Sequence, residues 1–320
     1  MFYGLDIGGS KIEIAIFNPD LQIINNWRVD TPTIDYQEFI DAIVTMVCQA
    51  DAQTGQSGHV GIGLPGVIDA NNLLLSANIP CASGKNVSHD LQQRLQRHIV
   101  IENDSRCFVL SEAVDGAGIG HNNVFCAIIG TGAAGGLAIN GQLYQSRQGI
   151  AGEYGHMQLS GLLQQKYNLP VRACGCGLLN CYERFISGPG LQFLYTHFDN
   201  ANNQQPTAPE IIKRWQQNEA VAVQTMDCYF DLLGACFANL VIVYDPDIIV
   251  LGGGLSLINK IGERLNQAID PYLFGQFSAP PIVGAKYGDA SGVRGAALLA
   301  KQALSVRATR PNITQNIQLE

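Results

Sequence analysis

The chain has 320 residues, of which 47% are hydrophobic and 14% are charged. This balance is typical of a compact globular enzyme with room for two domains, and it excludes a disordered chain. The net charge of −8, together with the lack of any basic cluster, excludes nucleic acid as a partner.

The sequence also argues against a membrane. The most apolar run, 232–244, has 13 residues and contains Gly234 and Asn239. A membrane span needs about 20 residues, so we expect a buried helix. The first apolar segment contains Asp6 and has no cationic start, unlike a signal peptide. Nine cysteines, an odd number, indicate reduced thiols, and we expect a cytoplasmic protein.

The first third of the chain reads as an α/β unit. Apolar patterns predict strands at 2–7, 12–17, 21–29, 60–64 and 98–101, and helices at 36–50 and 87–97. The strand 98–101 is followed by Glu102, Asn103 and Asp104. Open α/β sheets bind ligands at the carboxyl ends of their strands, so these side chains are candidates for chemistry.

The pattern then begins again. A strand at 124–129, a glycine turn at 130–136 and a returning strand at 137–140 repeat the strand–turn–strand unit of the N-terminus, which suggests two duplicated lobes facing a cleft. Asn140-Gly141 is a strong hairpin signal. Helices are expected at 189–198, 207–217, 219–243 and 295–304, with a strand at 248–251 that runs into Gly252–Gly254 and a further helix after it.

One His and three Cys gather within 26 residues: His156, Cys174, Cys176 and Cys181. Four such ligands without an open position predict a structural zinc site. Gly175 and Gly177 suit the tight turns that such a loop needs. The alternative is a pair of reduced cysteines with a hydrogen-bonded core histidine. Glu153 and Glu183 bracket the site and suit recognition of a polyhydroxylated ligand.

The glycine turns predict a phosphate site. Gly130-x-Gly132-x-x-Gly135 matches the dinucleotide fingerprint, but that motif requires a helix after the glycines, and a strand is expected here. Successive backbone N–H groups can instead form an anion nest. The alternative is that these glycines only close tight turns. Two such turns, at 6–11 and 130–136, together with the glycines at 252–254, favour a binding site for a triphosphate.

Three side chains near the first turn and strand are singled out. Asp6 is a candidate magnesium ligand, directly or through water. Lys11 is placed to meet a phosphate or to remain solvated. Asp104 is the candidate general base, and the alternative is that it only caps the helix that follows.

Several segments together resemble the ROK family of sugar kinases over residues 2 to about 304. They are Asp6–Lys11, Gly130–Gly132, Gly155-His156, the Cys-x-Cys-Gly-x-x-x-Cys-x-Glu stretch and 245–254. The resemblance implies a two-lobed, actin-like ATPase fold of the ribonuclease H-like α/β class with a central cleft. It also implies a structural zinc, transfer of the ATP γ-phosphoryl group to a hexose hydroxyl with Mg²⁺, and a last helix that returns to the N-terminal lobe.

The resemblance implies a small lobe of 1–117 plus about 290–305, a large lobe of 118–289 with the zinc site, and a tail of 306–320. It makes Asp104 the base, and His156 holds zinc with one ring nitrogen and sugar with the other. The expected sugar site comprises Gly66, Asn78, Ser83, Gly84, Asn103, Asp104, Glu153, His156 and Glu183. The expected ATP site comprises Gly4, Asp6, Gly8, Gly9, Ser10, Lys11, Gly130, Thr131, Gly132, Ala133, Gly135, Gly136, Gly252, Gly253 and Gly254.

Two positions depart from the family pattern. Asn180 stands where the family usually has Gly, and Asn tolerates left-handed backbone better than most residues. Ser10 stands where Thr is usual, and the hydroxyl is kept. A first phosphate turn at residue 6 also leaves no room for the N-terminal helix-turn-helix of the family's repressors.

Within the family, 77–85, 156–159 and 172–177 resemble the N-acetylglucosamine kinases, whereas 111–116 and 291–297 resemble the fructokinases. The first group flanks the expected sugar, so we expect ATP-dependent phosphorylation of N-acetyl-D-glucosamine to its 6-phosphate. A fructokinase or glucokinase, N-acetylmannosamine as the sugar, and a non-catalytic sugar sensor stay open as alternatives. The oligomeric state also stays open, a homodimer included.

Overall fold

The computed structural model describes residues 1–199 and 205–309, the last four of these by their backbone only. The chain divides into two compact units. Unit 1 comprises 1–111, 146–149 and the chain from Asp289 on, and unit 2 comprises 112–145 and 150–288. The sequence placed the first boundary after 117 and the return near 290, and it did not anticipate the short excursion at 146–149. Of the predicted tail, 306–309 continue the last helix, and 310–320 lie outside the described residues.

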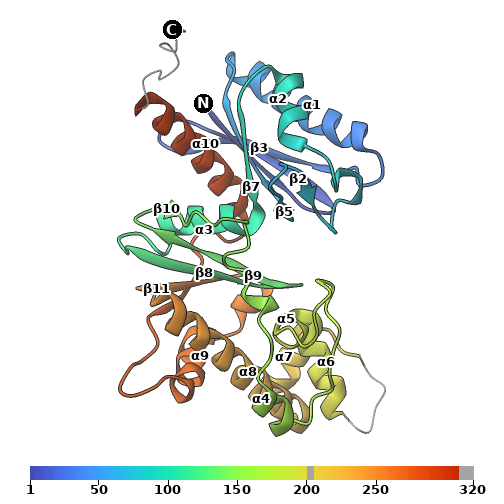
Figure 1. Ribbon diagram of the computed structural model, residues 1–320, viewed down its shortest axis with the longest axis vertical. Helices are drawn as coiled ribbons and strands as arrows, with labels where there is room; N and C mark the ends of the chain where they lie inside the picture. Colours follow the sequence, from blue (N-terminus) through green and yellow to red (C-terminus); the bar gives the residue numbers. More distant parts are fainter. Residues whose placement is uncertain (200–204, 310–320) are drawn as a thin grey trace, which may run out of the picture. The chain divides into compact units, whose positions relative to one another are not determined.

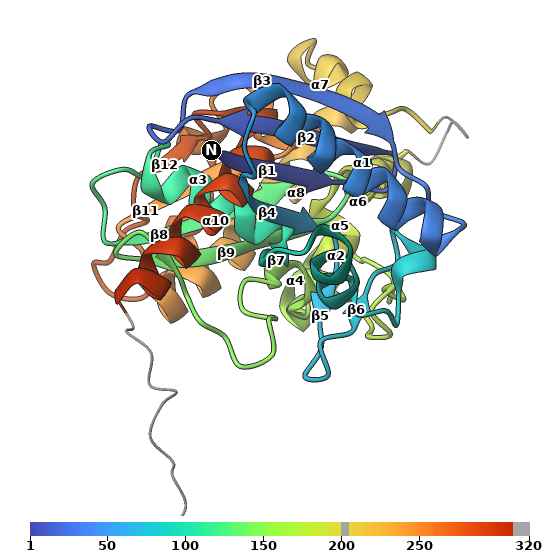
Figure 2. The same ribbon diagram turned by 90° about the horizontal axis from the view of Figure 1, so that it is seen from above.

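Unit 1 contains a five-stranded sheet in the order β3-β2-β1-β4-β7 (Figure 2). The strands are β1 (Phe2–Ile7), β2 (Lys11–Phe17), β3 (Ile23–Asp30), β4 (His59–Leu64) and β7 (Ile99–Asn103). The first three form an antiparallel meander, and β1, β4 and β7 run parallel. A separate hairpin is formed by β5 (Val67–Ile68) and β6 (Leu74–Leu75).

Helices cover both faces of this sheet (Figure 1). Tyr3, Leu5 and Ile7 share one apolar core with α1 (Tyr36–Thr54) and α2 (Val87–Leu95). Alternate side chains of a strand point to opposite faces, so Gly4 and Asp6 face the other side. There α10 (Ser291–Thr309) lies so close that a Cβ on Gly4 would be 1.8 Å from the Val293 carbonyl oxygen.

The sheet of unit 2 repeats this topology in the order β10-β9-β8-β11-β12. Its strands are β8 (Asn123–Ile129), β9 (Ala133–Ile139), β10 (Gln142–Leu143), β11 (Ile248–Gly252) and β12 (Ile282–Gly284). Three antiparallel strands are again followed by two parallel ones. Asn140 and Gly141, with φ of 51° and 71°, form the predicted turn. The duplication expected from the sequence is therefore present.

The core of unit 2 is built around α8 (Ala220–Tyr244). Among the described residues, α8 is the one helix long and apolar enough to cross a membrane, but 61% of its apolar window is buried, as in a core helix. Around it lie α4 (Gly161–Lys166), α5 (Glu183–Ile186), α6 (Gly188–Phe198), α7 (Ala208–Gln216) and α9 (Ile261–Ile269). The helix α3 (Asp104–Val114) contains the first crossing from unit 1 to unit 2.

Candidate functional site

The candidate base and magnesium ligand lie at one edge of the unit 1 sheet. The parallel strands β1, β4 and β7 end together, with Asp6 opposite Gly63 and Gly63 opposite Glu102. Asn103 follows Glu102, and its Nδ2 donates a 2.9 Å hydrogen bond to the Gly66 carbonyl oxygen. The strand ends therefore gather Asp6, Gly66, Asn103 and the following residue, Asp104, as the sequence led us to expect.

Capping of α3 falls to Asn103 rather than to Asp104. The Asn103 Oδ1 accepts hydrogen bonds from the backbone N–H groups of Ser105 (2.9 Å) and Arg106 (3.3 Å), the usual role of a capping residue. Asp104 is the first residue of the helix, and its Oδ1 accepts from the Ser105 N–H at 2.7 Å. Burial raises the pKa of Asp104. The alternative of Asp104 as a cap alone is thus not supported.

Asp6 is a half-buried carboxylate in an anionic setting. Burial, followed by the charges of Asp104 and Glu13, raises the pKa of Asp6 to about 7. A Cβ on Gly292 would lie 2.2 Å from Asp6 Oδ2, so the carboxylate packs against the first turn of α10. Asp104 and Glu13 disfavour a negative charge on Asp6, and a bound divalent cation would offset that repulsion. The position of Asp6 therefore suits a divalent cation.

The first phosphate turn is exposed and only partly as expected. Gly8 donates its N–H to the Lys11 carbonyl oxygen (2.8 Å), and Gly9 and Ser10 lie at the surface. Lys11 forms an exposed ion pair with Asp30, so in this arrangement its ammonium is committed to a carboxylate on β3. Gly4, another predicted ATP contact, instead packs beneath α10.

The predicted loop at 77–85 is exposed at all three of its singled-out positions. Asn78, Ser83 and Gly84 are at the surface of unit 1, whereas Gly66 is half-buried. Gly66 (φ 125°) and Gly84 (φ 77°) both use backbone angles that favour glycine. The Ser83 Oγ accepts a hydrogen bond from the Ser76 N–H at 3.3 Å. The Asn78 backbone approaches Gly9, where an added Cβ would lie 3.1 Å from the Asn78 carbonyl oxygen.

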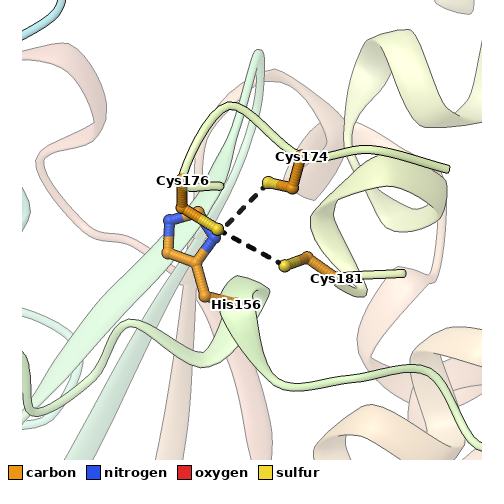
Figure 3. A group of neighbouring side chains, drawn as sticks. All are labelled: His156, Cys174, Cys176 and Cys181. Atoms are coloured by element: carbon orange, nitrogen blue, oxygen red, sulfur yellow. Dashed lines mark hydrogen bonds between the residues drawn. The ribbon is translucent and has the colours of Figure 1, made fainter. Parts of the chain in front are cut away.

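In unit 2 the four predicted metal ligands converge (Figure 3). The candidate ligand atoms of His156, Cys174, Cys176 and Cys181 all lie within 4.8 Å of one another. The Cys176 and Cys181 sulfurs are 3.6 Å apart, and Cys174 Sγ is 3.7 Å from His156 Nδ1. A tetrahedral zinc with bonds of about 2.3 Å would require S–S separations of about 3.8 Å. The donors therefore fit that ion in number, type and spacing.

The thiols differ in their surroundings. A backbone hydrogen bond from Leu178 lowers the pKa of the exposed Cys176. Burial raises the pKa of Cys181 to about 12. A metal ion binds the thiolate form, so Cys181 must lose a proton that its surroundings otherwise retain.

Asn180 holds the loop in the shape that the metal set needs. Its φ is 55°, so the prediction that Asn replaces Gly in a left-handed conformation is confirmed. Its Oδ1 accepts the Arg172 N–H at 2.8 Å, and its Nδ2 donates to Gln164 Oε1 at 2.9 Å. Gly177 also has positive φ (88°), whereas Gly175 does not.

The two acids that bracket the metal set differ in role. Glu153 Oε2 lies 4.0 Å from His156 Nε2, the nitrogen that faces away from the thiols. Glu183 Oε2 accepts a hydrogen bond from the Ala133 backbone N–H at 3.0 Å, and its Oε1 is 4.0 Å from Cys174 Sγ. Glu183 thus touches the second phosphate turn, a contact across 50 residues that sequence reasoning missed.

A strand follows that turn, as predicted, although it begins at Ala133 rather than at 137, and it excludes the dinucleotide motif. The Gly130 N–H donates to the Gly132 carbonyl oxygen and the Ala133 N–H to Glu183. In the part of the chain that the structure describes, this leaves the N–H groups of Thr131 and Gly132 for a ligand. The predicted contacts Gly135 and Gly136 are buried in β9, where an added Cβ on Gly135 would lie 2.1 Å from the Cys126 carbonyl oxygen.

A cavity of about 730 Å³ opens beside this turn within unit 2. Gly130 and Thr131 of the turn line it, and the predicted glycine run contributes Gly254. Gly252 ends β11, and Gly253 (φ 80°) packs against the Ile129 carbonyl oxygen. The sequence did not single out the other lining residues, which come from separate segments: Gly188, Pro189, Gln192, Thr207, Ala208, Pro209, Ile212, Leu255, Leu257 and Ile258. Its size and mainly apolar lining suit a nucleotide.

Comparison with known proteins adds the decisive observation, since the model of the ROK family matches residues 2–303. The chain belongs to the ROK family. An N-acetylgalactosamine kinase from Shewanella sp. (strain ANA-3) is 46% identical over 93% of this chain and 96% of its own length. An N-acetyl-D-glucosamine kinase from Salmonella gallinarum is 41% identical over 93% and 99%.

Two solved structures of ROK proteins are similar to this one. A ROK hexokinase from Thermus thermophilus has a TM-score of 0.84 at 29% identity, with 95% of this chain and 99% of that chain covered. A ROK family glucokinase from Streptomyces griseus, in complex with glucose and AMPPNP, has a TM-score of 0.71 at 29% identity, with 94% and 99% covered. The ROK chain described here has the two-domain actin-like ATPase fold of these kinases.

Proposed function

We propose that this ROK protein is an ATP-dependent sugar kinase that phosphorylates N-acetyl-D-glucosamine at its 6-hydroxyl. The observation that carries the proposal is the strand edge of unit 1, where Asp104 is half-buried and Asn103 does the capping. The four relatives described above, each at least 29% identical to this chain, are named as sugar or amino-sugar kinases. A non-catalytic sensor would have no use for the Asp104 carboxylate.

In this reaction Asp104 acts as the general base. A primary hydroxyl is a weak nucleophile at neutral pH, and Asp104 takes its proton as the oxygen attacks the γ-phosphorus. The bond from that phosphorus to the β–γ bridging oxygen breaks, and ADP leaves. Asn103 positions the base by fixing the start of α3 and by its bond to Gly66.

The nucleotide is assigned to the cavity of unit 2. Its apolar lining suits the adenine ring, and the turn at Gly130–Gly132 offers N–H groups to phosphate oxygens. Asp6 would hold Mg²⁺, directly or through water, and Mg²⁺ supplies charge neutralisation of the phosphates when bound. Of the exposed first turn, Gly8, Gly9 and Ser10 are assigned to the phosphates.

Zinc is proposed as the resident ion of the His156–Cys181 set. With Nδ1 toward the thiols, His156 keeps Nε2 for a sugar hydroxyl, and Glu153 is close enough to orient that ring edge. The ion would be structural, since four protein donors fill its tetrahedron. Glu183 is a further proposed sugar contact of unit 2, and Asn78, Ser83 and Gly84 are the sugar contacts proposed for unit 1.

The second candidate substrate is N-acetyl-D-galactosamine, which the 46% identical relative favours. Both sugars carry an acetamido group. The segments at 77–85 and 172–177 resemble those of N-acetylglucosamine kinases, which act on such a sugar. A cytoplasmic location is proposed with the function, because ATP and reduced thiols both belong to that compartment.

The test is coupled ADP release with the two N-acetylhexosamines, N-acetylmannosamine, glucose, mannose and fructose. We expect the highest kcat/KM with N-acetylglucosamine. A higher value for N-acetylgalactosamine would select the second candidate. A preference for glucose or fructose would refute both amino-sugar assignments, and no turnover with any sugar would refute the kinase assignment.

A further inference from the structure

The Glu183 side chain bridges the metal set and the second phosphate turn. Its Oε1 lies 4.0 Å from the Cys174 sulfur, and its Oε2 accepts the Ala133 N–H at 3.0 Å. Both contacts lie within unit 2. Hydrogen bonds to an ionised carboxylate are about twice as strong as neutral ones, so this contact is suited to fixing the turn.

The segment after the last metal ligand holds both ends of the turn. Glu183 lies two residues after Cys181 and binds Ala133, where β9 begins. Gly188, just beyond α5, donates its N–H to the Gly130 carbonyl oxygen at 2.7 Å. The start of α5 and the start of α6 therefore contact the turn on either side of Thr131 and Gly132, whose N–H groups are the ones left for phosphate.

The segment before the first metal ligand packs against the turn as well. An added Cβ on Gly155 would lie 2.1 Å from the Ala133 carbonyl oxygen, so the two backbones are in close contact next to His156. Tyr154 donates its hydroxyl to the Ile128 carbonyl oxygen at 2.8 Å. Movement of either end of the metal set would thus be transmitted to the turn.

We infer that Glu183 is a positioning residue for the nucleotide: it ties the metal loop to the phosphate turn, so that the metal set supports ATP binding as well as sugar binding. The inference rests on the proposed kinase function. It also explains Gly132, because a Cβ there would lie 2.8 Å from Glu183 Oε2 and would displace the carboxylate.

The experiment is ADP binding by calorimetry without any sugar, on full-length protein with its metal content measured. Glu183→Gln removes the charge and keeps the size. We expect it to retain the metal and to raise the Kd for ADP about tenfold. The matched control is Glu219→Gln, a carboxylate of unit 2 that accepts the Tyr195 hydroxyl at 3.0 Å, and it should leave the Kd within about twofold.

Chelation completes a thermodynamic cycle. Removing the metal from the wild type should weaken ADP binding by a similar factor, and removing it from Glu183→Gln should add little, because the two changes act through one contact. Unchanged ADP affinity in metal-replete Glu183→Gln, or fully additive effects, would overturn the inference.

If Glu183→Gln loses its metal or does not fold, Gly132→Ala takes its place, since the added methyl displaces the carboxylate without removing it. Normal ADP affinity in that variant would also overturn the inference. A wild-type protein that binds no ADP would instead count against the proposed function itself.

Discussion

The two sheets share one topology but carry different chemistry. In unit 1, β1 and β2 place Asp6 opposite Glu13 just before the turn. In unit 2, β8 and β9 place Ile128 opposite Ala134 at the corresponding level. One copy of the motif thus presents carboxylates to its strand edge, and the other is apolar there. The alternation of apolar residues along the strands and the glycine turns give both copies the same backbone. The side chains at a few register positions determine the chemistry of each copy.

The turns differ in the same way. The turn at Gly8–Ser10 is exposed and is held by the chain next to it on β2 and after β3. The turn at Gly130–Gly132 is held by Glu183 and Gly188, more than 50 residues further along the chain. Duplicated hairpins can therefore diverge through what packs around them, without a change of their own backbone.

The largest expected effect tests the chemistry of unit 1. Asp104→Asn should lower kcat about 10²–10⁴-fold, because the amide cannot accept the hydroxyl proton. Thermal midpoint, zinc content and ADP affinity should stay near wild type. The control is Asp35→Asn, an acid that does cap a helix, accepting the Glu38 N–H on α1. That variant should be nearly silent. Near-normal turnover of Asp104→Asn would move the base elsewhere.

The same base gives a pH dependence. Burial raises the pKa of Asp104, and the base must be ionised to act. Activity should therefore fall as pH decreases, and it should begin to fall at a higher pH than an ordinary aspartate would require. A rate profile from pH 4 to 8 measures this, provided that the enzyme stays folded over the range. A profile flat down to pH 4 would contradict a buried carboxylate base.

The next effect tests the metal set that only unit 2 has. Cys176→Ser should lose zinc, because three donors remain, and should raise the KM for sugar by loosening His156 and the loop. Elemental analysis and steady-state kinetics measure both. Cys48→Ser, at an exposed cysteine of unit 1, is the control and should change neither. Wild-type protein purified without chelator and lacking zinc would refute the assignment.

A smaller effect tests the carboxylate that unit 2 lacks. The pKa of Asp6 is raised to about 7 from an ordinary value of 3.8, so the folded state binds more protons than the unfolded state between these pH values. The protonated Asp6 carboxyl therefore contributes to the unfolding free energy at low pH, and this contribution is lost as the pH rises from about 4 to about 7. Asp6→Asn should raise the unfolding free energy by about 1–2 kcal/mol at pH 8, after allowance for solvent, and by little at pH 4.

Thermal unfolding without Mg²⁺ at the two pH values checks the Asp6 prediction. The same variant should lose most activity, because the proposed magnesium contact is gone. Equal stabilisation at both pH values would mean that packing against Gly292, and not the charge, sets the effect.

The smallest effect concerns Asn180. Asn180→Ala keeps a side chain at a φ of 55° and loses both amide contacts, so it should cost about 1–2 kcal/mol and weaken zinc retention. Asn180→Gly relieves the backbone and should cost less. Chelator competition and thermal midpoints of the two variants separate the backbone from the side chain. A glycine variant less stable than the alanine variant would show that φ is not the limiting factor.

The sequence by itself determined the local features: the strands of the first meander, the first strand of the second, the Asn140-Gly141 turn, the left-handed Asn180 and the ligand types of the metal set. These features depend on residue type and on the spacing of near neighbours, both of which can be read directly from the sequence. It also indicated the duplication, because the same strand–turn–strand pattern occurs twice.

Only the tertiary structure decided the contacts between distant segments. Sequence spacing could not show that Asn103 caps α3, that Lys11 pairs with Asp30, or that Gly4 lies beneath α10. It could not show the cavity lining or the bond from Ala133 to Glu183 either. Such contacts form where separate elements pack together, and a single sequence carries no local signal of which partner each side chain meets.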